Sequence, residues 1–309
     1  MSLRLHLAGL LAALLAACGG AGDGASGVRV IGGPGGADGR FITPRSVSVA
    51  AGRLWVADRS GRVQCLDLEG RHLLTARVES PETRGFPVGV TALDDGGCLV
   101  CDTHASRVLR LDADGRQVLA FGRYGPGHGE FTYPERAAVS DGRWFISEYG
   151  EGAANRVQVF ETAGDFVRAF GSYGHGPGQF TRCIGLALLG DEVFVADVSD
   201  RIIVYSLQGR FLREFGRSGT SPGELRYPYG LCIHDGLLCV AEYGNNRVQR
   251  FTPDGETRGC FGRAGRAPGE FSGPWDVCSD GRFLYVADTG NHRVQVIDSA
   301  DVTWHTGAP

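Results

Sequence analysis

The sequence lacks lysine altogether, so all 31 basic residues among its 309 residues are arginine. It also lacks an excess of positive charge, since 35 acidic residues leave a formal net charge of −4. That balance argues against a generic polyanion binder, and we expect no nucleic-acid partner. The exclusive use of arginine is typical of a coding bias, so an arginine by itself indicates no particular chemistry.

Three other patterns are missing. The chain has no Gly-x-Ser-x-Gly motif and no Gly-x4-Gly-Lys-Ser/Thr motif. Their absence argues against an α/β-type serine hydrolase and against a P-loop nucleotide site. After Val28 no stretch keeps a 3.6-residue apolar period, which argues against a helical repeat protein.

The chain has instead an internal repeat of 44 to 49 residues. Each unit begins with a Phe or Leu, two further residues and usually a Pro. A strand of alternating apolar residues, a glycine turn and a second strand ending in an acid follow. A third strand opened by arginine and a fourth strand closing at Phe-Gly complete the unit. The acids are Asp58, Asp102, Glu148, Asp197, Glu242 and Asp288. Four short antiparallel strands in each of six units predict an all-β protein, a six-bladed β-propeller.

The two ends of the repeat predict how the ring closes. Residues 28–32 match the fourth strand of a unit whose first three strands are missing, and the last unit loses the pattern after its third strand. We therefore expect the N-terminal strand to complete the sixth blade, within one propeller domain of residues 28–309. In a second-ranked alternative, residues 302–305 supply that outer strand.

Residues 1–17 have the pattern of a secretory signal peptide. Arg4 precedes an apolar run from Leu7 to Ala17, which is too short to span a bilayer. The run ends in Leu-Ala-Ala-Cys, which resembles the lipobox of bacterial lipoproteins and so implies acylation of Cys18; the alternative is an ordinary secretory leader cleaved nearby. Residues 18–27 then form a glycine-rich tether. The expected location is the bacterial cell envelope, lipid-anchored in the outer membrane and facing the periplasm.

Eight cysteines follow Cys18. Cys101 stands where other units have Ala, and Cys239 stands where they have large apolar residues. Cys98 and Cys101 form a Cys-x-x-Cys pair, but residues i and i+3 of a strand point to opposite faces, unlike the redox motif at a helix start. We therefore expect the eight to be mostly unpaired small hydrophobes.

Two segments resemble the signature of NHL repeats. Residues 286–296 read Val-Ala-Asp-Thr-Gly-Asn-His-Arg-Val-Gln-Val, and residues 242–249 are a near copy. The resemblance extends over about 270 residues and implies the six-bladed propeller. It implies little about activity, because similar propellers serve as lyases, hydrolases, RNA readers, sensor domains and binding platforms.

The most repeated polar feature is the acid that ends each second strand together with the arginine that opens the third. These arginines are Arg62, Arg107, Arg156, Arg201, Arg247 and Arg293. A functional ring of charges would be six-fold redundant, whereas a loop-bracing ion pair answers a need of every blade. We therefore expect bracing pairs, to which the bidentate arginine fork is suited.

Residues that vary at repeated positions are better candidates for a site, because the scaffold does not require them. In a propeller the connectors between blades and the loops between second and third strands gather on one face, around the channel mouth. The polar and aromatic candidates for ligand binding there are Arg45, Glu135, Arg136, Tyr149, Tyr229, Tyr243, Trp275 and Asp276. The alternative is ordinary channel lining with solvent and internal ion pairs.

The histidines do not indicate a metal site, because they fall at different phases of the repeat and only His104 and His292 share a loop type. The leading hypothesis is a monomeric, non-catalytic binding or scaffold module without a cofactor. It would bind a peptide, protein or glycan at the channel mouth and meet the membrane through its lipid anchor only. The alternative is an envelope lyase or hydrolase, similar to peptidyl-hydroxyglycine lyases, with a divalent metal in the central channel.

Overall fold

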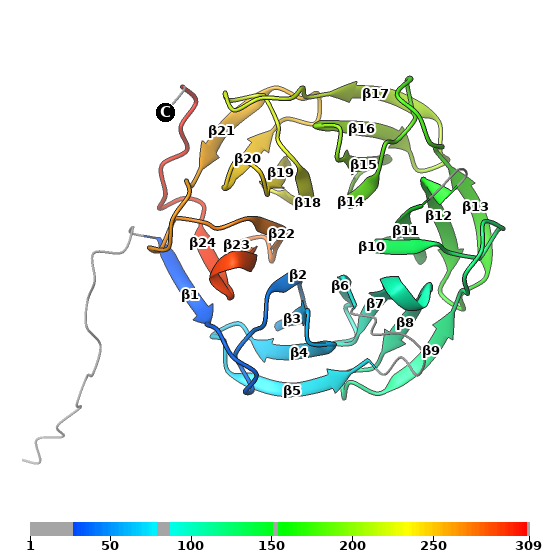
Figure 1. Ribbon diagram of the computed structural model, residues 1–309, viewed down its shortest axis with the longest axis horizontal. Coiled ribbons are helices and arrows are strands. Elements are labelled where there is room, and N and C mark those ends of the chain that lie inside the picture. The colour runs from blue at the N-terminus through cyan, green and yellow to red at the C-terminus, as the bar shows by residue number, and fades with distance from the viewer. Residues whose placement is uncertain (1–26, 79–86, 151–153, 308–309) are drawn as a thin grey trace, which may run out of the picture.

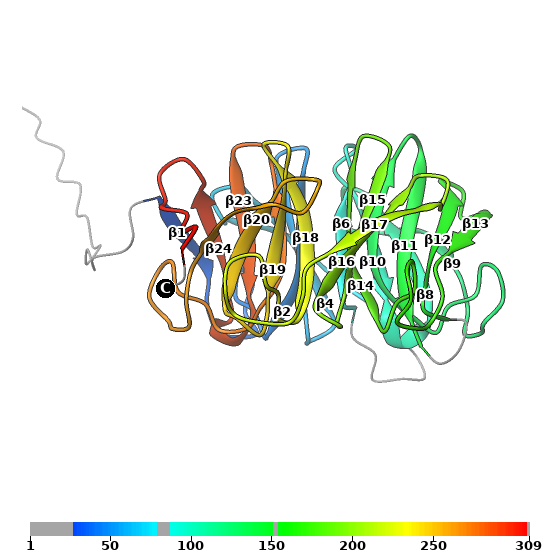
Figure 2. The ribbon, with the colours of Figure 1, turned by 90° about the horizontal axis from the view of Figure 1, so that it is seen from above.

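Six four-stranded antiparallel sheets surround a central channel like the blades of a propeller (Figure 1). The computed structural model describes residues 27–78, 87–150 and 154–307. Seen edge-on, the blades stand side by side in one flat ring (Figure 2). The predicted six-bladed fold is thus confirmed, whereas the predicted signal peptide, Cys18 and residues 18–26 lie outside the described residues.

Within blades one to five the strands run in chain order from the channel outward. Blades one to three are β2 (Pro44–Ala50), β3 (Arg53–Asp58), β4 (Arg62–Asp67) and β5 (His72–Arg77); β6 (Gly89–Ala92), β7 (Cys98–Asp102), β8 (Arg107–Leu111) and β9 (Gln117–Phe121); and β10 (Tyr133–Ser140), β11 (Arg143–Tyr149), β12 (Arg156–Glu161) and β13 (Phe166–Phe170). Blades four and five are β14 (Cys183–Leu189), β15 (Glu192–Asp197), β16 (Arg201–Ser206) and β17 (Phe211–Phe215); and β18 (Pro228–His234), β19 (Leu237–Glu242), β20 (Arg247–Phe251) and β21 (Thr257–Phe261).

The sixth blade joins the two ends of the chain. Its strands are β22 (Pro274–Ser279), β23 (Phe283–Asp288), β24 (Arg293–Asp298) and, outermost, β1 (Val28–Gly32). β1 lies antiparallel to β24, with Val28 opposite Ile297 and Gly32 opposite Arg293. The N-terminal strand therefore closes the ring, as predicted. The alternative is wrong, because His305 bridges instead to Cys260 on the outer strand of blade five.

The core lies between neighbouring blades. In the second strands nearly every residue is buried, because blades pack against both faces of each sheet. Phe145 and Val157 of blade three, for example, share one apolar cluster with Val193 and Val195 of blade four. The eight cysteines of the described residues are all free and six are buried, so they act as small core residues.

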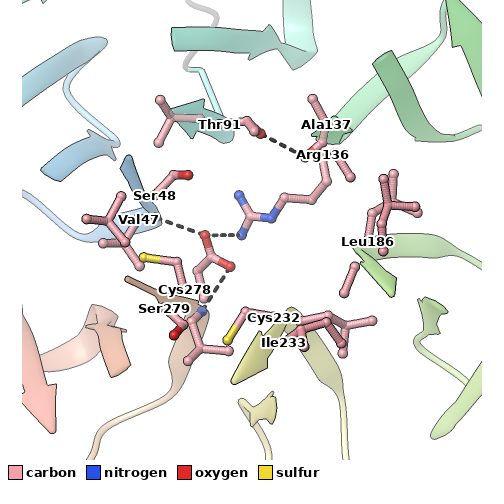
Figure 3. A pocket seen from close by; sticks show the side chains of 18 of the residues that line it. Val47, Ser48, Thr91, Arg136, Ala137, Leu186, Cys232, Ile233, Cys278 and Ser279 are labelled. Carbon is pink, nitrogen blue, oxygen red and sulfur yellow. Dashed lines mark hydrogen bonds and ion pairs between the residues drawn. The ribbon is translucent and has the colours of Figure 1, made fainter. Parts of the chain in front are cut away.

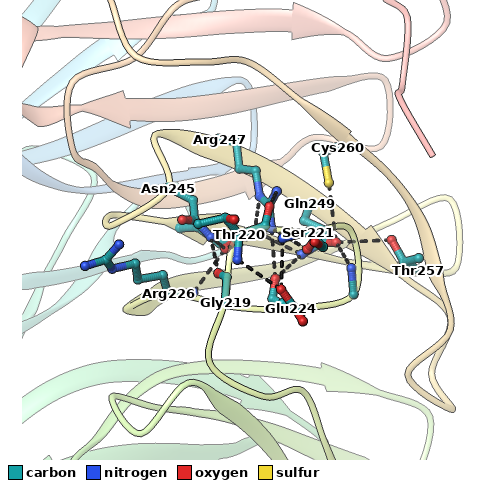
Figure 4. Close-up of polar contacts among 12 residues, drawn as sticks. Gly219, Thr220, Ser221, Glu224, Arg226, Asn245, Arg247, Gln249, Thr257 and Cys260 are labelled. Carbon is teal, nitrogen blue, oxygen red and sulfur yellow. Dashed lines mark hydrogen bonds and ion pairs between the residues drawn. The ribbon is translucent and has the colours of Figure 1, made fainter. Parts of the chain in front are cut away.

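The repeated acid and arginine form an ion pair in all six blades, as predicted, with N···O distances of 2.6 to 3.2 Å. Figure 4 shows the arrangement in blade five. Arg247 Nε donates to Glu242 at 2.6 Å, and its other nitrogens donate to the carbonyl oxygens of Thr220 and Glu224 in the incoming connector. Gln249 adds bonds to the same carboxylate and to the Glu224 carbonyl. The pair therefore fastens the connector to the blade that it enters.

Helical structure among the described residues is limited to short turns, such as the 3-10 turns η1 (Thr103–Ala105) and η3 (Thr289–Asn291). Within this part of the chain, no helix has the length and apolar character that crossing a membrane would require.

Ring closure by β1 can be tested at Ile31, which is 3% exposed and packs with Phe41 and Val294. We expect Ile31→Ala to lower the free energy of unfolding by about 2–5 kcal/mol, because it leaves a cavity in the closing seam. Val30→Ala is the matched control, since Val30 is 38% exposed on the same strand and should cost at most about 0.5 kcal/mol. Equal losses in chemical denaturation would contradict the docking of β1.

Candidate functional site at the channel mouth

The six innermost strands, β2, β6, β10, β14, β18 and β22, surround the channel and start on the same face of the ring (Figure 1). In blades one, three, four, five and six, the buried acid of the second strand holds the connector just before the inner strand starts. Glu148, for example, accepts the backbone N–H of Thr132 at 2.8 Å, three residues before Glu135. We call the first layer of residues the channel mouth: Arg45, Val88, Glu135, Ile184, Tyr229 and Trp275.

The next layer inward closes the channel. Gly89 and Gly185 let neighbouring blades approach closely, since a Cβ at these positions would lie 2.0 Å from the Glu135 carbonyl oxygen and 2.3 Å from that of Tyr229. The narrow passage that results is filled by Arg136 and Asp276, which come from blades on opposite sides of the ring (Figure 1).

Arg136 and Asp276 form an ion pair across the channel, with Arg136 Nη2 3.1 Å from Asp276 Oδ2 and both residues at most 5% exposed. We call them the cross-channel pair (Figure 3). The same carboxylate oxygen accepts from Ser46 Oγ and from the Val47 N–H, each at 2.9 Å. Burial raises the pKa of Asp276, while Arg136 and these donors oppose the rise. The pair therefore ties blades one, three and six together.

Beyond the cross-channel pair the channel widens into a cavity of about 320 Å³. Apolar side chains such as Leu186 and Ile233 line it, together with the thiols of Cys232 and Cys278 (Figure 3). Burial raises the pKa of both thiols far above the ordinary value, so they are neutral at physiological pH. This chamber is separated from the channel mouth by the cross-channel pair.

On the mouth side of that pair lies a buried carboxylate among arginines. Glu135 is 2% exposed, and its Oε1 accepts from Arg182 at 3.2 Å. Burial raises the pKa of Glu135, while the Arg182, Arg136 and Arg45 guanidinium groups oppose the rise. Since Asp276 already neutralises Arg136, a single carboxylate is left for the charges of Arg45 and Arg182.

Each of these two arginines lies over an aromatic ring. The Arg45 guanidinium carbon is 4.6 Å from the ring centre of Trp275, and that of Arg182 is 3.8 Å from Tyr149. Tyr229 packs against the rings of Trp275 and Tyr243, with centroid distances of 4.5 and 5.4 Å, and these two rings also contact each other. Burial raises the pKa of Tyr149 to about 12, and Glu135 adds to the rise, so its hydroxyl stays protonated.

All eight predicted site residues thus lie together at or directly below the channel mouth. Five buried polar atoms there have no hydrogen-bond partner in the described structure, although buried polar atoms are nearly always paired. They are Arg45 Nε, Glu135 Oε2, Arg136 Nε, Arg182 Nε and Trp275 Nε1.

The described histidines are spread over the ring and do not meet in the channel. His292 Nδ1 accepts the Thr43 N–H at 3.0 Å. His234, the last residue of β18 in blade five, forms hydrogen bonds with Ser279 and Ser299 of blade six. Among the residues that the structure describes, no three His, Cys, Asp or Glu side chains lie close enough together to hold a metal ion.

Sequence reasoning missed Arg182 and Tyr133, which line the mouth beside Glu135 and Tyr149. Both occupy the position just before the usual proline, where other blades have residues such as Thr43 and Gly273. A non-repeated residue at a repeated position was therefore present two residues before the compared positions Glu135 and Ile184. Extending the comparison of units to the residue before the proline would have found both.

The cross-channel pair yields a stability prediction. We expect Arg136→Met to lower the free energy of unfolding by about 3–5 kcal/mol, because it leaves the Asp276 carboxylate buried without its cation. Adding Asp276→Asn should recover at least half of that loss, since the amide still accepts the Val47 N–H and carries no charge. If the two single losses simply add in chemical denaturation, the residues do not interact across the channel.

Comparisons with solved structures show the same fold. A streptogramin B lyase structure is 14% identical, with a TM-score of 0.61 over 87% of this chain and 97% of the other. Virginiamycin B lyase from Staphylococcus aureus is 14% identical, with a TM-score of 0.61 over 88% of this chain and 98% of the other. A gluconolactonase from Xanthomonas campestris is 17% identical, with a TM-score of 0.62 over 84% of this chain and 86% of the other. At these identities the similarity establishes the fold alone.

No curated protein is similar enough in sequence to count as a relative. Family descriptions do match parts of the chain. The NHL repeat matches residues 225–251 and 271–297, which are the two segments around the predicted signatures. A family described as a 6-bladed beta-propeller matches residues 134–217. The chain is therefore a six-bladed β-propeller that carries NHL repeats.

Proposed function

We propose that the chain is a non-catalytic binding module that captures a peptide, protein or glycan ligand at the channel mouth. The observation that carries the proposal is the cluster of buried polar atoms without partners at Arg45, Glu135, Arg182 and Trp275. A buried donor or acceptor without a partner costs about 1–3 kcal/mol, so such a cluster needs a compensating use. Bound ligand groups would supply the missing partners.

The fold itself does not require these groups. Val88 and Ile184 occupy the same position as Glu135 in other blades and are 2% and 1% exposed, so apolar residues close the ring equally well there. Charged and aromatic side chains that replace apolar ones at one end of a channel are typical of a ligand site. The aromatic rings offer apolar contact, and the arginines and Glu135 offer directed hydrogen bonds.

The proposal includes a place for the protein as well as a site. A lipid on Cys18, followed by the tether, would hold the propeller as a monomer at the bacterial cell envelope, in the outer membrane facing the periplasm. The leader pattern supports this location. The negative net charge speaks against a nucleic-acid partner, and binding through the mouth groups requires no cofactor.

The second candidate is an envelope lyase or hydrolase with a metal-assisted site in the channel. Its support is that propellers of this fold include proteins described as streptogramin B lyase and gluconolactonase. Metal analysis of the purified chain separates the two candidates. A stoichiometric divalent ion, whose removal abolishes turnover of an added ester or lactone, would replace the binding proposal with the enzyme.

Binding at the mouth can be tested with a panel of acidic and neutral oligosaccharides and short peptides, measured by calorimetry on the full chain. We expect at least one to bind and Arg182→Gln to weaken that binding about 10- to 100-fold, because a charge-assisted hydrogen bond is lost. Arg263→Gln is the matched control, since Arg263 is an 82% exposed connector residue paired with Glu270. The proposal fails if no panel member binds, or if both variants weaken binding equally.

A further inference from the structure

We propose that the ligand is a short carboxylate-bearing oligosaccharide, a uronate chain, which enters the channel mouth with its acidic end and extends outward along a tyrosine-lined groove. This rests on the proposed function and specifies its ligand class. The inference combines the charge of the mouth, the shape of its surroundings and the way in which the inner strand edges are closed.

The charge of the mouth favours an anion. Arg45 forms no ion pair within the described residues, and the charge of Arg182 is shared only with Glu135. Stacking on Trp275 and Tyr149 holds the two guanidinium planes in place. The planar edge of a guanidinium group matches a carboxylate in a bidentate fashion, which makes these two arginines a suitable clamp. The free Oε2 of Glu135 can then accept from a neighbouring hydroxyl group.

The groove begins where the mouth ends. Tyr149 belongs to both, because it stacks under Arg182 and on Tyr133, with the two tyrosine ring centroids 5.0 Å apart. From there a depression of about 510 Å³ continues past Tyr133 to Tyr124 and Pro126 in the connector between blades two and three. Tyr124 is 75% exposed and Tyr133 is 38% exposed. Flat apolar rings with a polar hydroxyl suit the faces of sugar rings, which also combine apolar and polar surface.

An extended peptide is less suited to this site. A peptide commonly binds by adding a strand to a free sheet edge, where main-chain hydrogen bonds supply the affinity. In this ring, side chains of neighbouring blades already occupy the edge at three backbone N–H groups: that of Val47 donates to Asp276, that of Val90 to Ser46, and that of Ala92 to Ser48. A peptide therefore cannot pair with these positions of β2 and β6, which favours recognition through side chains, as sugars are recognised.

The test compares trigalacturonate with its trimethyl ester and with triglutamate, by calorimetry on the full chain. We expect trigalacturonate to bind at least about tenfold more tightly than the ester, because the ester cannot pair with the arginines. We expect it also to bind more tightly than triglutamate, which carries three side-chain carboxylates, and the same net charge, without sugar rings. Equal affinity for the acid and the ester would overturn the anion clamp.

The groove has its own matched pair of variants. Tyr124→Ala should weaken trigalacturonate about two- to tenfold and leave galacturonate monomer unchanged, because only the longer ligand reaches the groove. Tyr173→Ala is the control, since Tyr173 is the corresponding connector residue between blades three and four, 54% exposed and outside the groove. Equal effects of the two variants would overturn the direction of binding.

The remaining outcomes separate this inference from the proposed function. If triglutamate binds more tightly than trigalacturonate and Arg182→Gln abolishes it, the mouth is a ligand site and the sugar is wrong. If neither acid binds but another panel member binds in a manner sensitive to Arg182→Gln, the anion clamp is wrong and the binding module stands. If nothing binds, both fail.

Discussion

The buried acid at the end of each second strand is the constraint on which the rest of the ring depends. It pairs with the arginine that opens the third strand, and in blades one, three, four, five and six it also accepts a backbone N–H of the incoming connector. In the same five blades the arginine donates to connector carbonyls as well. A connector held at both its N–H and C=O groups delivers the inner strand at a fixed height, and with it the residue at the channel mouth.

This explains why the repeat predicts the scaffold so well and the site only in part. The acid–arginine pair recurs in all six units, and residues 28–32 supply the strand that the last unit lacks, so comparison within the chain was enough to predict six blades and closure by β1. The positions of the eight site candidates could also be predicted, because these residues vary at positions that repeat in every unit. The sequence could not show that Arg136 pairs with Asp276, since that contact joins residues 140 positions apart across the ring. Ring curvature and close approach at Gly89 and Gly185 bring them together.

The residues missed by sequence analysis have a common physical reason. Arg182 directly precedes β14, and Tyr133 is the first residue of β10, so both lie at the junction between connector and strand, where the alternation of strand faces does not by itself predict the direction of a side chain. Their orientation is decided by partners on other elements: Glu135 and Tyr149 for Arg182, and Tyr149 for Tyr133. The same holds for residues 302–305, whose strand-like pattern fits either blade. β1 already occupies the edge of β24, so that segment lies against β21, where Trp304 stacks under Arg250.

The acid–arginine pairs that hold the connectors and the cross-channel pair together determine how the mouth can bind a ligand. Asp276 neutralises Arg136 and closes the channel, so the chamber lined by Cys232 and Cys278 is cut off from the mouth. The groups that remain on the mouth side are fixed before any ligand arrives. Trp275 holds Arg45, and Tyr149 and Glu135 hold Arg182. The acid–arginine pairs hold the strands beneath them. Binding to such groups orders few side chains, and the Glu135 carboxylate is already removed from water. Recognition at this site therefore depends on matching hydrogen bonds and charge, and the buried atoms without partners are reached only when neighbouring side chains move aside.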